Sequence, residues 1–190
     1  MSFAIRPLSI SGLFTLLPEA FRDSRGCFLE TWAERDFLAA GLDLRFVQDN
    51  QSMSRKGVLR GLHYQKSHPQ GKLVRVISGE IFDVAVDLRT ESPTFGLWEG
   101  VFLTGEKQNQ LYVPPGFANG FLALSDDTVV IYKCTDYYHP EDEYGIRWDD
   151  PRIGIAWPDL GMAPFLSVKD QSLPGFDPTR ACFKADGSSL

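Results

Sequence analysis

Polar side chains interrupt an apolar, strand-like stretch in the first half of the chain. In residues 48–65 (QDNQSMSRKGVLRGLHYQ), short polar side chains recur at every second position from Gln48 to Ser54, and Arg60 and His63 follow. Residues at a period of two share one face of a β-strand, so this row can line a polar cavity. A guanidinium can grip a phosphate through its planar fork, and a histidine can act as a base near neutral pH. A solvent-exposed strand with a structural histidine is the alternative interpretation.

Three further residues have side chains suited to the same cavity. Asp170, in the polar segment SVKD, would orient the imidazole of His63 if the two met, although an aspartate in a turn is more often a cap. Lys72 follows Gly71 at the start of a predicted strand, where an edge-strand lysine is the commoner explanation. Tyr132 lies in a late strand, where a buried phenol usually packs and only an adjacent base or cation argues for proton transfer.

The histidines and cysteines do not form a metal-binding or disulfide pattern. Three of each are widely spaced: His63, His68 and His139, and Cys27, Cys134 and Cys182. Small cupin barrels hold a metal through paired histidines and a later one, but here a single histidine occupies the first position and Asn119 the later one. We therefore predict a barrel that works without metal, and three free thiols. Glycine-rich phosphate loops, paired catalytic carboxylates and a serine elbow are also absent.

Composition limits the class of protein further. The 190 residues are 43% hydrophobic and 13% aromatic, which predicts a single domain, residues 1–190, with a large core. A formal net charge of -6 without a basic run argues against nucleic acid as a partner. No apolar stretch approaches the roughly 20 residues needed to span a membrane, and no secretory signal opens the chain, so we expect a soluble, cytoplasmic protein.

The elements that must position these residues are mostly short strands. Seventeen Gly and 12 Pro divide the chain, and apolar residues between them alternate or form β-branched blocks, which is typical of an all-β jelly roll or barrel. The expected strands are Lys72–Ser78, Ile81–Arg89, Leu97–Leu103, Asn109–Val113, Gly120–Leu124 and Val129–Tyr137.

The same alternation of apolar and polar residues predicts the two faces of one strand and the positions of two turns. Alternation in Ile81–Arg89 predicts one core face and one polar face. Residues 78–80 (SGE) are expected to form a tight hairpin turn, and residues 114–116 (PPG) a rigid corner. Thr31–Gly41 predicts a short helix that caps one end of the barrel, and the Pro- and Gly-rich chain after Asp150 predicts a tail packed over the sheet.

Longer strings carry a resemblance to a known family. The chain contains QDN at residues 48–50, GVLRGLHYQ at 57–65, GKLVRV at 71–76, DVAVDLR at 83–89 and SPTFG at 92–96. It continues with PPGFA at 114–118, YKCTDYY at 132–138, Trp148, DP at 150–151, IGIAWP at 153–158 and KD at 169–170, and the early RDSRG at 22–26 also fits. In these strings and their order the sequence closely resembles the dTDP-4-dehydrorhamnose 3,5-epimerase family, over nearly its whole length.

The resemblance implies a cupin-like jelly roll that forms a homodimer, binds a nucleotide-linked 4-keto-6-deoxyhexose and inverts carbons beside the ketone without a cofactor. It implies that His63, oriented by Asp170, is the base, that Lys72 stabilises the enolate oxygen, and that Tyr132 returns a proton from the other face. Tyr138 would stack on the nucleotide base. The nucleotide diphosphate and sugar would be held by Arg25, Glu30, Gln48, Asp49, Asn50, Arg60, Glu143 and Lys169.

One position departs from the family pattern. The family usually has histidine after the Phe-Ala of the PPGFA string, whereas this chain has Asn119, which hydrogen-bonds but does not titrate near neutral pH. Two hypotheses follow, namely inversion of only one carbon and action on a different nucleotide sugar. A non-catalytic sugar-nucleotide-binding module is a further alternative, which the joint presence of a base and an acid disfavours.

Overall fold

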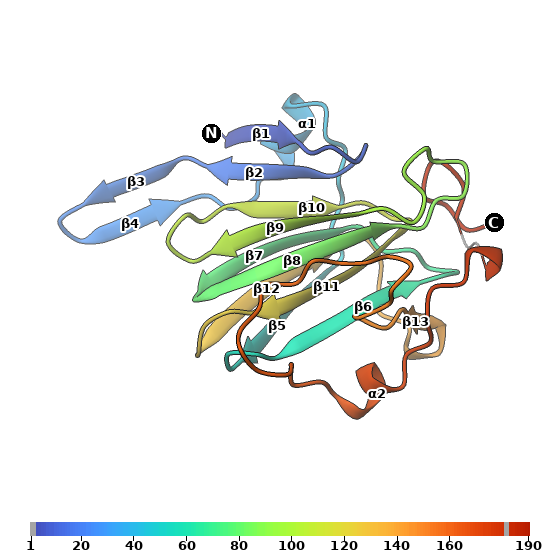
Figure 1. The fold of residues 1–190 in the computed structure, drawn as a ribbon. Helices are drawn as coiled ribbons and strands as arrows, with labels where there is room; N and C mark the ends of the chain where they lie inside the picture. Colours follow the sequence, from blue (N-terminus) through green and yellow to red (C-terminus); the bar gives the residue numbers. More distant parts are fainter. Residues whose placement is uncertain (1–2, 181–182) are drawn as a thin grey trace.

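The computed structural model describes residues 3–180 and 183–190, and most of these form two antiparallel sheets (Figure 1). One sheet contains, in spatial order, β1 (Phe3–Pro7), β2 (Phe14–Pro18), β10 (Gln110–Val113), β7 (Lys72–Ser78), β12 (Thr128–Cys134) and β5 (Gln48–Ser54). The other contains β13 (Glu143–Gly145), β6 (Leu59–Gln65), β11 (Phe117–Ala123), β8 (Glu80–Asp87) and β9 (Trp98–Thr104). We name them the six-stranded and the five-stranded sheet.

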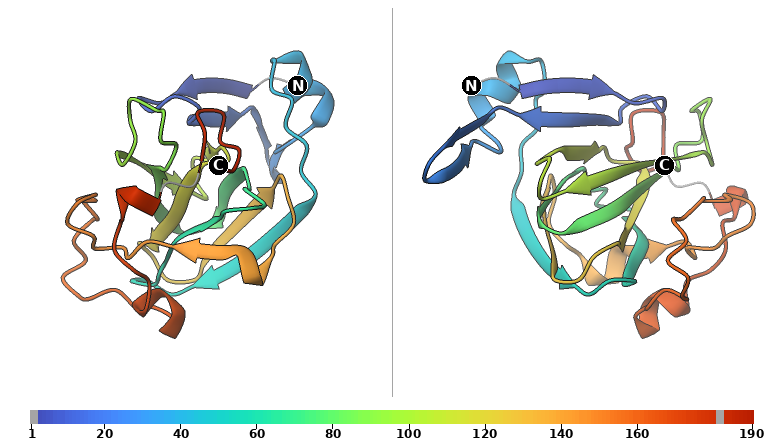
Figure 2. Two further views of the ribbon diagram at one scale, coloured as in Figure 1. Left: turned by 90° about the vertical axis from the view of Figure 1, so that its right-hand side faces the viewer. Right: turned by 60° about the vertical axis from the view of Figure 1, so that its left-hand side comes forward.

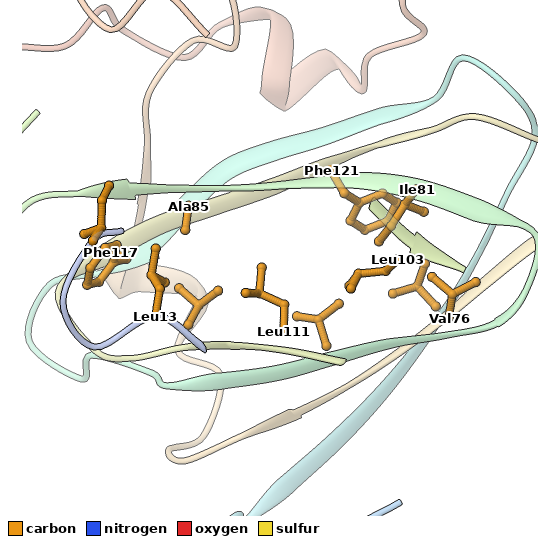
Figure 3. Packing of buried hydrophobic residues seen from close by; sticks show 12 residues of the cluster. Leu13, Val76, Ile81, Ala85, Leu103, Leu111, Phe117 and Phe121 are labelled. Carbon is orange, nitrogen blue, oxygen red and sulfur yellow. The ribbon is translucent and has the colours of Figure 1, made fainter. Parts of the chain in front are cut away.

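The main core lies between the two sheets. Val76 and Leu111 of the six-stranded sheet meet Ile81, Leu103 and Phe121 of the five-stranded sheet, and all are buried (Figure 3). This face-to-face packing of antiparallel sheets confirms the predicted jelly-roll architecture.

Strand β8 is buried on both faces, which corrects the prediction of one polar face. Ile81 and Ala85 point into the core between the sheets, while Val84 and Val86 belong to a second core on the outer side of the five-stranded sheet. Asp83, which shares the inner face, is fully buried. Alternation therefore separated the two faces correctly, but the face expected to be polar, which carries Asp83, is the one that points into the core between the sheets.

The outer face of the five-stranded sheet is covered by the C-terminal part of the chain, as predicted. Ile153 and Phe183 are buried against that sheet, and Trp157 and Phe176 pack at the edge of the same cluster. This part also contains a one-turn helix, α2 (Val168–Gln171), where the sequence indicated only a polar turn. The described residues also include two short 3₁₀ segments, Pro140–Asp142 and Pro178–Arg180.

The predicted early helix is shorter than expected and has a different place. Helix α1 (Glu34–Ala39) buries Phe37 against Leu16, Leu73 and Tyr112. These three residues lie on the outer face of the six-stranded sheet, because Val74 and Leu111, their neighbours in sequence, point into the inner core. The helix therefore covers a sheet face and does not close the end of the barrel.

Two connections cross between the sheets. Residues 78–80 join β7 to β8, but these strands belong to different sheets, so the predicted hairpin is wrong and the turn is a corner. Gly79 has a φ of +82°, and a Cβ there would lie 2.5 Å from Thr128 Oγ1, so the corner requires glycine. The PPG segment joins β10 to β11 and is a corner, as predicted.

The predicted strands are confirmed with shifted ends, and several strands were missed. The observed bounds are Glu80–Asp87, Trp98–Thr104, Gln110–Val113, Phe117–Ala123 and Thr128–Cys134, and Lys72–Ser78 is as predicted. The strands not predicted as such are β1, β2, β6, β13 and a separate hairpin of β3 (Ala20–Asp23) and β4 (Gly26–Leu29).

The β3–β4 hairpin projects away from both sheets (Figures 1 and 2). All four residues of β3 are exposed, and in β4 Phe28 has an exposed fraction of 69%. Phe21 is opposite Phe28 in the register, so two exposed rings lie side by side on this arm. A large exposed apolar pair on a projecting hairpin is typical of a surface that another chain covers.

Candidate active site

A cavity of about 480 Å³ opens between the two sheets and contains most of the predicted site residues. Strands β5, β7 and β12 form one wall, and β6, β11, β13 and helix α2 form the other. Eleven of the fourteen predicted residues line it: Gln48, Asn50, Arg60, His63, Lys72, Asn119, Tyr132, Tyr138, Glu143, Lys169 and Asp170.

An irregularity in β6 brings Arg60 and His63 to the same wall. Residues three apart in a regular strand face opposite sides of the sheet. Here the pairing of β6 with β11 shifts between Asn119, which is opposite His63, and Phe121, which is opposite Arg60. The shift adds one residue to β6, so both side chains point inward.

His63 and Asp170 form a hydrogen-bonded pair although 107 residues separate them. His63 Nε2 lies 2.6 Å from Asp170 Oδ1. Burial would raise the pKa of Asp170, but the hydrogen bond and charge of His63 outweigh it and lower the pKa. An ionised carboxylate at Nε2 favours the tautomer that carries its proton there, which leaves Nδ1 free to accept a proton.

Helix α2 holds Asp170 in this position. Ser167 caps its N-terminus, and the serine Oγ accepts a hydrogen bond of 3.0 Å from the backbone N–H of Asp170. Asp170 is 4% exposed, so its carboxylate is fixed between the helix and β6. The capping side chain is therefore that of Ser167, and the Asp170 carboxylate pairs with His63, so the alternative in which the aspartate itself acts as a cap is wrong.

The opposite wall carries a cation and a phenol. Lys72 starts β7 and Tyr132 lies on the neighbouring β12, both on the inner face of the six-stranded sheet. Burial lowers the pKa of Lys72, and burial raises the pKa of Tyr132, so the phenol keeps its proton at neutral pH. A base on one wall therefore faces an acid and a cation on the other.

Glu143 connects three predicted site residues. Its carboxylate accepts hydrogen bonds from Lys169 Nζ and from the Tyr138 hydroxyl, the latter at 2.5 Å, and lies 3.7 Å from His63 Nδ1. Burial would raise the pKa of Glu143, but these partners lower it. The hydrogen bond to Glu143 raises the pKa of Tyr138 to about 12, so Tyr138 stays neutral with its ring at the cavity mouth.

The segment that carries Tyr138 is tied to both walls. The backbone N–H of Tyr138 donates to Gln48 Oε1 at 2.8 Å, and that of His139 donates to Gln65 Oε1 at 2.7 Å. Gln65 also donates to the carbonyl of Tyr137 at 3.0 Å and is buried. A buried glutamine with both polar atoms paired holds this loop in place.

Asp83 does not line the cavity but contacts the cavity residue Asn119, and sequence reasoning assigned it no role. Its carboxylate accepts a 2.6 Å hydrogen bond from Asn119 Nδ2, while its Oδ2 has no partner. Burial raises the pKa of Asp83 to about 7, although Asn119 and the Lys72 charge oppose the shift. An aspartate at an inward position of an otherwise apolar strand was the available signal, but it requires knowing which face is inner.

Three predicted residues lie outside the cavity. Asp49 is on the outer face of β5, where it pairs with Lys133 Nζ at 2.8 Å. Arg25 is in the β3–β4 turn and pairs with Asp23, and Glu30 lies beside Phe37, so neither reaches the cavity of its own chain. Two of the three, Arg25 and Glu30, belong to the projecting hairpin and the residues that follow it.

The described residues contain neither a disulfide between Cys27 and Cys134 nor a group that could hold a metal ion. Cys27 is exposed and Cys134 is buried, and both are free thiols, while Cys182 lies outside the described residues. In residues 3–180 and 183–190 no group of three histidine, cysteine or carboxylate side chains could hold a metal ion. In the same residues no helix is long and apolar enough to cross a membrane.

Solved structures of similar proteins share this fold. A dTDP-6-deoxy-D-glucose-3,5-epimerase from Legionella pneumophila, solved in complex with dTDP-4-keto-L-rhamnose, is 47% identical, with a TM-score of 0.87 over 93% of this chain and 100% of that chain. A 3'-monoepimerase from Streptomyces bikiniensis, in complex with dTDP-quinovose, is 38% identical, with a TM-score of 0.84 over 89% and 86%. Likeness of fold thus extends to a double epimerase and to a mono-epimerase.

Sequence comparison covers nearly the whole chain. The dTDP-4-dehydrorhamnose 3,5-epimerase of Methanothermobacter thermautotrophicus is 60% identical over 163 residues, which are 86% of this chain and 88% of that protein. The enzyme of the same name from Escherichia coli is 48% identical over 166 residues, 86% and 89% of the two chains. A family model described as dTDP-4-dehydrorhamnose 3,5-epimerase matches residues 7–177. On this identity and coverage, the chain belongs to the dTDP-4-dehydrorhamnose 3,5-epimerase family.

Proposed function

We propose that the cavity epimerises a nucleotide-linked 4-keto-6-deoxyhexose at both carbons that flank the ketone, C3 and C5, in the manner of dTDP-4-dehydro-6-deoxyglucose to dTDP-4-dehydrorhamnose. The single observation that carries this proposal is the placement of a base and an acid on opposite walls. His63 with Asp170 is on the five-stranded side, and Tyr132 with Lys72 is on the six-stranded side. Inversion requires a proton to leave one face of a carbon and return to the other.

The residues divide the reaction into two proton transfers. Nδ1 of His63 takes the proton from the carbon, and the electron pair of the broken C–H bond moves to the ketone oxygen as an enolate. The Lys72 ammonium stabilises that oxyanion, which is an electrostatic contribution made where the charge develops. Tyr132 then donates its phenolic proton to the opposite face of the carbon. No electron is gained or lost overall, so these steps call for no cofactor.

The other cavity residues are proposed to hold the nucleotide. Arg60 has an exposed guanidinium at the cavity wall, positioned by hydrogen bonds of 3.2 Å to Ser54 Oγ and to the Met53 carbonyl, where it can bind a phosphate. Tyr138 offers its ring for stacking on the base. Gln48, Asn50, Glu143 and Lys169 supply the remaining polar groups around the sugar and the diphosphate.

We also propose that the protein works as a homodimer in the cytoplasm, as one domain per chain. The β3–β4 hairpin exposes Phe21 and Phe28 and carries Arg25 away from its own cavity. A second copy would cover the exposed rings and receive Arg25 and Glu30 at its nucleotide site. The unpaired, exposed thiol of Cys27 supports a reducing compartment.

Proton NMR of the protein with dTDP-4-keto-6-deoxyglucose in deuterated water tests the proposed reaction. Exchange of the hydrogens at C3 and C5, with inversion at both, is expected. Exchange at one carbon only would instead show a mono-epimerase. Binding of the sugar nucleotide without exchange at either carbon would show a binding module and contradict the proposal.

A further inference from the structure

Asn119 stands beside the proposed base. It lies on β11 directly opposite His63 of β6, and on its other side it is opposite Ala85 of β8. Side chains directly opposite each other in an antiparallel pair have Cβ atoms roughly 5 Å apart. Asn119 and His63 both line the cavity, so the two side chains face the same part of a bound sugar.

The amide group of Asn119 has a fixed orientation. Its Nδ2 donates to Asp83 Oδ1 at 2.6 Å and to the carbonyl oxygen of Val84 at 3.1 Å. A backbone carbonyl only accepts hydrogen bonds, so the nitrogen must face Val84 whether or not Asp83 carries a proton. Both amide hydrogens are used in these two bonds.

The side-chain oxygen of Asn119 is available to accept a hydrogen bond from a ligand. Among the described residues no group donates to Asn119 Oδ1, and the residue lines the cavity. This oxygen can only accept a hydrogen bond. In a 4-keto-6-deoxyhexose the ketone, the ring oxygen and the methyl group cannot donate, so only hydroxyl groups of the sugar match it. Of the two carbons beside the ketone, C3 carries a hydroxyl, whereas C5 carries the methyl group and the ring oxygen.

We propose that Asn119 is a specificity-determining residue whose Oδ1 accepts a hydrogen bond from the C3 hydroxyl of the sugar. The inference rests on the proposed function, because it assigns a group of that substrate to this cavity. This hydrogen bond makes the cavity bind sugars with a free hydroxyl at C3 more tightly than 3-deoxy sugars. Since an amide does not titrate near neutral pH, this acceptor keeps its polarity throughout that range, unlike an imidazole at the same position.

Equilibrium binding tests the assignment without depending on turnover. We would measure by calorimetry the Kd of dTDP-6-deoxyglucose, which has no ketone and does not epimerise, and of its 3-deoxy and 2-deoxy analogues. For the unaltered protein the loss of the C3 hydroxyl is expected to weaken binding about tenfold, the effect of one hydrogen bond. Asn119→Leu should bind dTDP-6-deoxyglucose about tenfold more weakly and show no further loss with the 3-deoxy analogue.

Two controls separate this effect from misfolding and from a different hydroxyl. Asn119→Leu leaves the Asp83 carboxylate without its donor, so the double variant Asp83→Asn/Asn119→Leu is measured beside it, and dTDP alone should bind all variants equally. The penalty for the 2-deoxy analogue should be the same with and without Asn119. An unchanged 3-deoxy penalty in both variants, or a penalty that moves to the 2-deoxy analogue, overturns the inference. Failure of the proposed function would appear separately, as absent exchange at C3 and C5.

Discussion

His63 depends on Asp170 for both its tautomer and its orientation. Asp170→Asn keeps the shape of the side chain but removes the charge that holds the proton on Nε2. We expect kcat to fall at least about 100-fold, which is the usual contribution of a positioned base, while KM changes little. Steady-state kinetics checks this, with Asp149→Asn as the matched control, because Asp149 pairs with Arg147 at the surface, away from the cavity. A loss of less than about threefold would exclude Asp170 from the positioning of the base.

Asp83 makes folding stability depend on pH. In the folded protein burial raises its pKa from 3.8 to about 7, so the folded state keeps a proton that the unfolded chain releases above about pH 4. Stability therefore falls as pH rises from about 4 to about 7. Asp83→Asn removes this decline and should be more stable at pH 8, with about 4 kcal/mol as the upper limit set by the size of the shift.

Urea unfolding of both proteins at several pH values between 5 and 8 measures this difference. The advantage of Asp83→Asn should grow with pH up to about 7 and then level off. The same pH dependence in both proteins would show that Asp83 is ionised or hydrated in the folded state.

The types of the reacting residues were recognisable from the sequence, but their contacts were not. Residue spacing alone gave no reason to pair His63 with Asp170, since the contact depends on where the C-terminal chain crosses the sheet. The resemblance to a family supplied that pairing. Asp83 was missed because alternation shows two faces without showing which is inner.

At the scale of elements, the site depends on the close approach of β6 and β11. Gly61 has a φ of +115°, and a Cβ on it would lie 2.7 Å from the Gly120 Cα and 2.8 Å from the Asn119 carbonyl oxygen. Backbone atoms cannot move aside as a flexible side chain can. Position 61, directly after Arg60, must therefore be glycine for the side chains of Arg60 and His63 both to point inward.

Gly61→Ala is expected to destabilise the protein by about 2–4 kcal/mol and to displace His63, with a loss of kcat in the folded fraction. Gly41→Ala is the matched control, because Gly41 also has a positive φ, +80°, but nothing lies within 4 Å of a Cβ at this position. The control should lose only about 1 kcal/mol. Thermal unfolding measures the stability of the two variants, and steady-state kinetics measures their activity. Equal losses of stability and activity in both variants would mean that the close approach of β6 and β11 is unimportant.

Strand identity was more predictable than strand pairing. Alternation and β-branched runs located β7, with its bounds as predicted, and β8, β9, β10, β11 and β12, with ends shifted by at most three residues. The turn at Gly79 was taken for a hairpin because both a hairpin and a corner between sheets need a positive φ. Strand β2 pairs with β1 on one side and with β10, from far along the chain, on the other, and local sequence does not contain that information.

At the scale of the whole molecule, the proposed homodimer implies that each cavity is completed by the other chain. Arg25→Ala should weaken substrate binding, and His63→Ala should abolish turnover. A mixed dimer of these two variants contains one intact site, in which the unaltered His63 cavity receives the unaltered Arg25 of its partner. After the subunits are mixed and re-equilibrated, activity at low substrate should return to about one quarter of the unaltered level, as random pairing of two subunits predicts.

Two results of this subunit-mixing experiment would contradict the proposed homodimer with shared sites. Activity that stays at the sum of the two separate variants, in a sample shown by light scattering to be dimeric, would place Arg25 outside the partner's site. A monomer by light scattering would contradict the homodimer itself.

The central claim is that His63 removes the proton in this cavity, and site-resolved deuterium incorporation tests it most directly. Proton NMR in deuterated water would follow C3 and C5 of dTDP-4-keto-6-deoxyglucose with the unaltered protein and with His63→Ala, after calorimetry has shown equal binding of dTDP. We predict exchange at both carbons with the unaltered protein and at neither with His63→Ala. Continued exchange by His63→Ala at the unaltered rate would contradict the account.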